Sequence, residues 1–170
     1  MSIKFEPTPE ERASFEGNAR LVLVRGPVAL MRLVGRTASG RANDPFGRYW
    51  FNERYFWKVI DFLSEHNRDV SLVNHYLKLV VREGLAVCHD WNSFAKVYQL
   101  RVPAGVEMQA YVGRAKPQPF FSAADQMGRG SPPHELLMGG EVQYVVDVDS
   151  VGRRYVSGPL PIGIHGIGHA

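Results

Sequence analysis

The pattern of apolar and polar positions predicts two groups of β-strands with a helical stretch between them. Two β-branched or apolar runs early in the chain are separated by Gly26-Pro27, which is a turn signal. Lys96–Val102 alternates apolar and polar residues, and Glu141–Val148 alternates most clearly. The predicted strands are 21–24, 28–34, 96–102, 106–113 and 141–148.

From Asn52 onward, apolar positions recur at the spacing of an α-helix as far as residue 83. The polar run His66-Asn67-Arg68-Asp69 divides this stretch, and Gly84 favours a stop. A pair of helices is therefore expected. The order of strands, helical pair and strands contains no βαβ alternation, which favours an α+β domain with a mainly antiparallel sheet.

The remaining segments predict less regular structure. Residues 1–18 predict a short helix or an arm, because proline and acidic residues at Pro7–Glu11 suit a first helical turn. Turn formers dominate 37–47, and the prolines and glycines of 114–140 predict a long loop. The Gly/Pro-rich end of the chain predicts a surface tail.

Composition places the chain among ordinary globular proteins. It has 170 residues, 45% hydrophobic and 22% charged, which favours a single domain. One cysteine excludes an internal disulfide and a cysteine-based zinc site. No metal is expected, because the spaced pair His165 and His169 stands in a glycine-rich tail without helical support. The apolar runs are far shorter than the ~20 residues of a spanning helix, and the charged start lacks a signal-peptide core.

Basic residues gather in the first third of the chain. The net charge is only +3, but the segment 20–48 contains several arginines and a single acidic residue, Asp44. This segment predicts an anionic ligand, with a solvated basic surface as the alternative. Arg32 is the most informative of them, because it is the one charge in the apolar run Val28–Val34. It needs a carboxylate, a ligand anion or, from an edge strand, a path to solvent.

Two further motifs carry candidate chemistry. In Gly47-Arg48-Tyr49-Trp50-Phe51, three consecutive aromatics cannot all face one core. A flat heteroaromatic ligand would fit such a segment, and the alternative is a core formed by Trp50 and Phe51 with Tyr49 at its rim. In Gly139-Gly140-Glu141-Val142-Gln143-Tyr144, the two-residue spacing predicts that Glu141 and Gln143 share a strand face. Such a pair can bind ribose hydroxyls and orient a nucleophile, unless that face is simply solvated.

In this order, the motifs resemble the ADP-ribosyltransferase-like toxin domains at the ends of bacterial polymorphic toxins. The last of them also resembles the catalytic strand of NAD glycohydrolases of the tuberculosis-necrotizing-toxin type. The resemblance covers about residues 28–148. The segments that carry it are Met31–Gly35, Gly47–Phe51, Lys96–Gly105, Gly113–Ala115 and Gly139–Tyr144.

The resemblance implies a split, mainly antiparallel two-sheet core that holds NAD in a central cleft, here with an inserted helical pair. Residues 28–148 would form this NAD-binding catalytic core, between an arm and first strand at 1–27 and a tail at 149–170. The implied NAD-binding residues are Arg32, Gly35, Tyr49, Trp50 and Phe51, and the implied catalytic residues are Glu141 and Gln143. NAD is then a substrate, and no metal is required.

The resemblance implies a mono-ADP-ribosyltransferase toxin that transfers ADP-ribose to a protein or nucleic acid. Gln143 departs from the common transferase pattern, because an amide cannot remove a proton from an acceptor, whereas Glu141 can. An NAD glycohydrolase is the first alternative, and an inactive binding module for an anionic partner is the second. An immunity protein is an implied partner and a membrane is not. A larger carrier or secretion would deliver the domain to the cytoplasm of a target cell.

Overall fold

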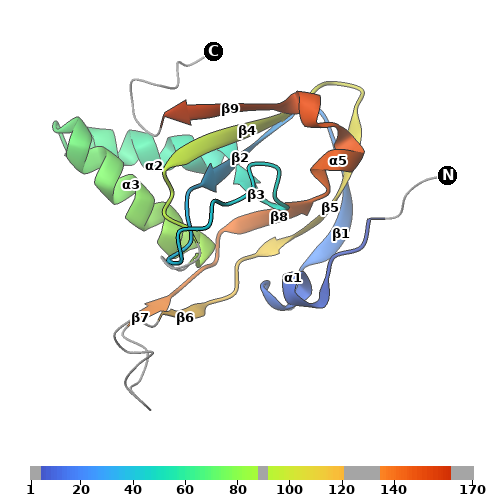
Figure 1. Cartoon of the computed structure of the whole chain (residues 1–170), viewed down its shortest axis with the longest axis horizontal. Coiled ribbons are helices and arrows are strands. Elements are labelled where there is room, and N and C mark those ends of the chain that lie inside the picture. The colour runs from blue at the N-terminus through green and yellow to red at the C-terminus, as the bar shows by residue number, and fades with distance from the viewer. Residues whose placement is uncertain (1–4, 88–91, 121–134, 162–170) are drawn as a thin grey trace.

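The computed structural model describes residues 5–87, 92–120 and 135–161, and it confirms an α+β fold with a seven-stranded antiparallel sheet (Figure 1). Residues 121–134 of the predicted loop and 162–170 of the predicted tail lie outside the described residues. The elements are α1 (Pro9–Ala13), β1 (Arg20–Arg25), β2 (Val28–Val34), β3 (Tyr49–Asn52), α2 (Glu53–His66), α3 (Val70–Leu85), β4 (Lys96–Val102), β5 (Glu107–Arg114), β6 (Gln118–Phe120), β7 (Glu135–Leu137), β8 (Val142–Val146), α5 (Val148–Val151), the 3₁₀ turn η1 (Arg153–Tyr155) and β9 (Val156–Pro161).

The main sheet has the order β1-β5-β8-β3-β2-β4-β9, and each strand is antiparallel to its neighbours. All five predicted strands are present. β1 and β2 follow one another in sequence but do not pair: β1 lies at one edge and pairs with β5, while β2 lies between β3 and β4. The sheet is therefore assembled from segments distant in sequence.

The sheet opens between β2 and β3. These strands pair only at Leu30 with Asn52 and at Met31 with Phe51. Beyond this point Arg32 of β2 pairs with β4, and Trp50 of β3 pairs with β8. The strands β1-β5-β8-β3 and β2-β4-β9 are thus joined by a short ladder within one seven-stranded sheet.

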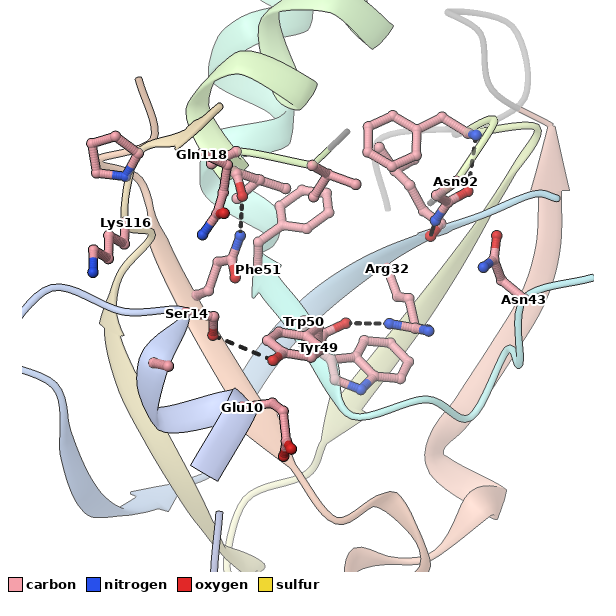
Figure 2. A pocket seen from close by; sticks show the side chains of 18 residues that line it. Glu10, Ser14, Arg32, Asn43, Tyr49, Trp50, Phe51, Asn92, Lys116 and Gln118 are labelled. Atoms are coloured by element: carbon pink, nitrogen blue, oxygen red, sulfur yellow. Dashed lines mark hydrogen bonds between the residues drawn. The ribbon is translucent and has the colours of Figure 1, made fainter. Parts of the chain in front are cut away.

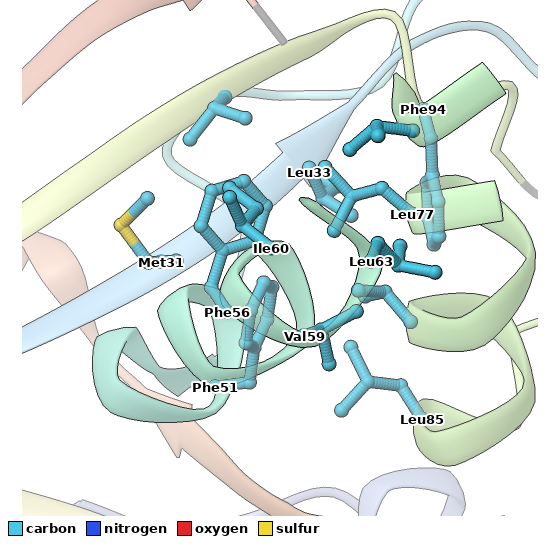
Figure 3. Packing of buried hydrophobic residues seen from close by; sticks show 13 residues of the cluster. Met31, Leu33, Phe51, Phe56, Val59, Ile60, Leu63, Leu77, Leu85 and Phe94 are labelled. Carbon is cyan, nitrogen blue, oxygen red and sulfur yellow. The ribbon is translucent and has the colours of Figure 1, made fainter. Parts of the chain in front are cut away.

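The predicted helical pair is confirmed and covers one face of the sheet. Asn52 caps α2 by accepting from the Arg54 N–H, and Asp69 caps α3 by accepting from the Ser71 N–H. The buried faces of both helices pack on β2 and β3, as Figure 3 shows. This cluster comprises Met31, Leu33, Phe51, Phe56, Val59, Ile60, Leu63, Val73, Leu77, Val81, Leu85, Phe94 and Val97. No helix in the described part of the chain is long and apolar enough to cross a membrane.

The opposite face of the sheet has its own core. Adjacent residues alternate between the two faces, so Leu30 and Trp50 join this second cluster while Met31 and Phe51 join the first. The second cluster comprises Leu30, Trp50, Leu100, Val102, Met108, Ala110, Val146 and Val148. The three consecutive aromatics are therefore divided between the faces, as the sequence predicts.

Three segments differ from their sequence prediction. β8 covers only Val142–Val146, because Asp147 leaves the strand to cap α5 by accepting from the Asp149 N–H. The predicted loop 114–140 contains β6 and β7, which pair with each other and are too short to show a period. The predicted tail contains β9, which pairs with β4 at the edge of the sheet. Proline is tolerated in an edge strand, so the Gly/Pro-rich composition that predicted a tail is compatible with β9.

The N-terminal segment folds as a short helix fixed to β3. Thr8 and Glu11 form a capping box at the start of α1. The buried Glu11 carboxylate forms an ion pair with Arg48 Nε at 2.9 Å, and the Arg48 guanidinium lies 4.9 Å from the Phe5 ring centroid. These contacts place α1 against the open end of the β2–β3 ladder.

We expect Leu77→Ala to lower the free energy of unfolding by about 2–5 kcal/mol, because Leu77 is 1% exposed between the helices and the sheet. Leu79→Ala is the matched control on the same helix. Leu79 is 39% exposed, and its truncation is expected to change stability by less than about 0.5 kcal/mol. Urea unfolding measures both, and equal losses would contradict the assigned faces of α3.

Candidate functional site

A cavity of about 780 Å³ lies at the opening between β2 and β3 (Figure 2). Its walls come from both strands, from α1, from the segment after α3 and from the segment after β5. The lining residues are Glu10, Ala13, Ser14, Arg32, Leu33, Asn43, Tyr49, Trp50, Phe51, Leu85, Ala86, Val87, Asn92, Phe94, Lys116, Pro117, Gln118 and Gln143. The structure thus brings together five of the predicted site residues, whereas Gly35 and Glu141 are not among the lining residues.

Arg32 extends across the opening from β2 to β3. Its Nη1 donates to Tyr49 O at 2.7 Å, and its Nε donates to Asp44 O at 3.1 Å. Among the described residues, no carboxylate lies within ion-pair distance of its guanidinium. Burial lowers the pKa of Arg32 to about 10, and the charge of Asp44 partly opposes this shift. Arg32 is therefore a positive charge that is held by backbone carbonyls and is chemically able to bind an anionic group.

Gly47 is needed for the placement of Arg32. A Cβ atom at Gly47 would lie 2.1 Å from Arg32 Nη2 and 2.6 Å from its Cζ. The guanidinium therefore packs directly on the backbone of the residue that opens the aromatic motif. A side chain at position 47 would therefore displace the Arg32 guanidinium from this position.

The three aromatic residues divide as the core-and-rim alternative predicts. Tyr49 is 37% exposed, and its hydroxyl lies 3.3 Å from Ser14 Oγ on α1. Burial raises the pKa of Tyr49 above its ordinary value. Trp50 and Phe51 are buried, and the Trp50 indole N–H donates to Gly47 O at 2.8 Å. Tyr49 is accordingly the aromatic side chain best placed to meet a ligand.

Gln143 lies on β8 beside Phe51 and is buried. The alternative from the sequence, in which Gln143 lies on a solvent-exposed strand face, is therefore wrong. Gln143 Nε2 donates to Leu85 O at 2.6 Å. Because the nitrogen side of the amide is turned toward α3, Oε1 is left to accept from a ligand. This oxygen can bind a hydroxyl or lie near a developing positive charge.

Glu141 does not share the cavity with Gln143. Its side chain lies by α2 and α3: a Cβ atom at Gly84 would be 2.8 Å from Glu141 Cγ. Burial, together with the negative charge of Glu141, raises the pKa of Tyr55. The alternation that places both residues on one face begins only at Val142, so it does not extend back to Glu141.

Gly35 does not line the cavity but packs against residues that do. Its N–H donates to Asn43 Oδ1 at 3.3 Å, and its carbonyl accepts from the Asn43 N–H at 2.9 Å. A Cβ atom there would lie 2.2 Å from Ser93 Oγ and 2.8 Å from Phe94 N. Glycine thus allows the end of β2 to approach the segment that carries Asn92 and Phe94.

The sequence did not reveal the wall formed after α3. Arg82 is buried in α3 and donates from Nη1 to Val87 O at 3.0 Å and from Nη2 to Asn92 O at 2.8 Å. Its guanidinium also lies 4.2 Å from the Phe94 ring centroid. One cation therefore fixes both flanks of residues 88–91, which lie outside the described residues. The available signal was an arginine that directly follows the apolar run Leu79-Val80-Val81.

Two rim charges were also missed. Glu10 of α1 and Lys116 after β5 both line the cavity, and Figure 2 shows Lys116 across the view from Arg32. The Lys116 N–H donates to Ser14 O at 3.0 Å, which ties this rim to α1. Within the described ranges, no group of three or more His, Cys, Asp or Glu side chains is placed to hold a metal ion.

Comparison with known proteins adds no identification. No protein-family model, no curated protein and no solved structure matches this chain.

We expect Gly35→Ala to reduce the free energy of unfolding by about 1–3 kcal/mol, because the new methyl group would collide with Ser93 and the Phe94 backbone. Gly17→Ala is the control, since nothing lies within 4 Å of a Cβ atom there. Urea unfolding of the two variants tests the packing behind the cavity. If Gly35→Ala were as stable as Gly17→Ala, the close approach described here would be wrong.

Proposed function

We propose that this chain binds NAD in the cavity between β2 and β3 and cleaves its nicotinamide–ribose bond. The observation that carries the proposal is convergence: Arg32, Tyr49 and Gln143, from motifs far apart in the sequence, line one cavity with Trp50 and Phe51. The resemblance to NAD-cleaving toxin domains rests on these same motifs. The toxin role, action in a target cell and an immunity partner belong to the same proposal.

The cavity suits the chemistry of NAD. Its volume of about 780 Å³ is within the range of ~300–1,000 Å³ typical of small-molecule sites. Arg32 offers a guanidinium to the pyrophosphate. Tyr49, Phe51 and Phe94 offer aromatic surface to a planar ring. Gln143 Oε1 offers an acceptor to a ribose hydroxyl.

Cleavage requires the carbon–nitrogen bond electrons to leave with nicotinamide, which departs as a neutral molecule. The ribose carbon then develops positive charge. The partial negative charge of Gln143 Oε1 stabilises the positive charge on this carbon. It acts either directly or through the ribose hydroxyl that Oε1 accepts from. Water adds to the carbon and loses a proton, so the products are nicotinamide, ADP-ribose and one proton.

Hydrolysis is favoured over transfer by the position of Glu141. This carboxylate is outside the lining of the cavity, and an amide at 143 cannot deprotonate an acceptor. Transfer to a macromolecule is the second candidate, and a different observation favours it. The outer face of α3 exposes Leu72, Tyr76, Leu79 and Val80, which form an apolar surface suited to a macromolecular acceptor.

We expect the purified chain to release nicotinamide from NAD, and Arg32→Ala to lower this rate on the order of 10²-fold. Arg41→Ala, in the exposed loop of the same basic segment, is the control and should retain the rate within about twofold. Unfolding curves check that the Arg32 variant remains folded. Absence of release from the intact chain, with and without cell extract, would leave the inactive binding module as the better proposal.

We expect Gln143→Met to reduce nicotinamide release on the order of 10²-fold and Glu141→Gln to reduce it far less, because only Gln143 lines the cavity. Labelled NAD and cell extract separate the two candidate reactions. Release without transfer of label identifies hydrolysis, whereas label on a macromolecule identifies transfer. Equal losses in both variants would contradict the assignment of the site.

A further inference from the structure

Carbonyl oxygens at the C-terminal end of α3 accept hydrogen bonds from alternate residues of one segment. The pairs, donor first, are Gly139 N with Glu83 O at 3.0 Å, Glu141 N with Gly84 O at 3.1 Å and Gln143 Nε2 with Leu85 O at 2.6 Å. The last carbonyls of a helix have no partner within the helix. The segment 139–143 therefore caps α3, and the Gln143 amide is its final donor.

We infer that the C-terminal end of α3 is a positioning device that holds Gln143 with its nitrogen toward Leu85 and its oxygen toward the cavity. The site then requires glutamine at 143, and a ligand group that meets this oxygen must be a hydrogen-bond donor, as a sugar hydroxyl is. The part of this inference that concerns cleavage rests on the proposed function. The positioning of the amide stands independently of it.

A glutamate at position 143 would face three obstacles. Its carboxylate has no proton to donate, so Leu85 O would lose its partner. The negative end of the α3 dipole disfavours a negatively charged carboxylate at position 143, and so does the burial of this position. The pKa of such a glutamate would therefore rise. A protonated carboxyl group, in contrast, donates to Leu85 O and presents its other oxygen to the cavity, as the amide does.

Other ionisable groups near position 143 also influence the pKa of a glutamate placed there. They are Arg82 and Glu83 of α3, Tyr55 of α2, Arg32 of β2, Tyr49 of β3, Arg114 of β5, Lys116, Glu10 of α1 and Glu141. Gln118 lines the same cavity from β6, which pairs with β7 close to the end of α3, but within the described residues its side chain makes no hydrogen bond to a carbonyl of α3. Gln118→Glu is therefore the matched control for Gln143→Glu.

The first test measures the urea midpoint of both variants of the full chain between about pH 4 and pH 8. The folded-state pKa of the new glutamate at 143 is expected above the unfolded value of about 4.3. Its stabilising bond is then fully present below that unfolded value and is lost as the pH rises through the folded value. The midpoint of Gln143→Glu should fall with rising pH relative to that of Gln118→Glu. Parallel midpoints would overturn the inference.

The second test compares nicotinamide release by Gln143→Glu and by the wild-type chain at each pH. Above the raised pKa the ratio should fall about tenfold per pH unit, because only the protonated form reproduces the amide. A ratio that is flat or increases with pH overturns the inference. Absence of release from the wild-type chain overturns the proposed function instead, and the urea titration still decides the positioning.

A third measurement uses the unaltered protein and does not depend on the folding of any variant. Hydrogen exchange followed by NMR should show a Gln143 side-chain proton exchanging on the order of tenfold or more slowly than those of Gln118, because it is bonded to Leu85 O. Similar exchange rates at the two side chains would show that Gln143 is free, and the inference would fail.

Discussion

The short ladder between β2 and β3 is the constraint on which the site depends. Within the described residues only Leu30–Asn52 and Met31–Phe51 join these strands, so the sheet is continuous at one end and open at the other. A longer ladder would fill the opening with paired backbone, and no ladder would leave the two halves unrelated in position. Arg32 uses the opening: it donates to carbonyls across it instead of pairing with a carboxylate.

The cavity wall opposite Arg32 is organised by α3. Arg82 inside the helix fixes Val87 and Asn92, and the carbonyls at the helix end bind the segment that leads into β8. Stability and site geometry thus share the same contacts, because the helix that buries Leu77 and Val81 also orients Gln143. The same helix therefore links the buried core to the cavity wall through hydrogen bonds to its final carbonyls.

The sequence predicted what depends on local periodicity and on a charge in an apolar setting. The apolar run of β2, the alternation in β4 and β8 and the helical period of α2 and α3 reflect burial that neighbouring residues share. Arg32 was identifiable because an apolar strand rarely carries a lone cation. Non-local contacts were not predictable. Glu141 was misplaced because the alternation was extended one residue before β8, where the capping of α3 determines the backbone.

The position of the edge strands has a consequence for how the chain folds. β1 is the first strand in sequence and β9 the last, yet they close opposite edges of one sheet. The strands that flank the cavity also pair over long separations, as Tyr49 does with Val145. Such pairings lose much chain entropy before they gain stabilising contacts, so folding is expected to be slow and cooperative. A chain still emerging from the ribosome cannot assemble the cavity until β8 is available, which delays any activity until synthesis of this region is nearly complete.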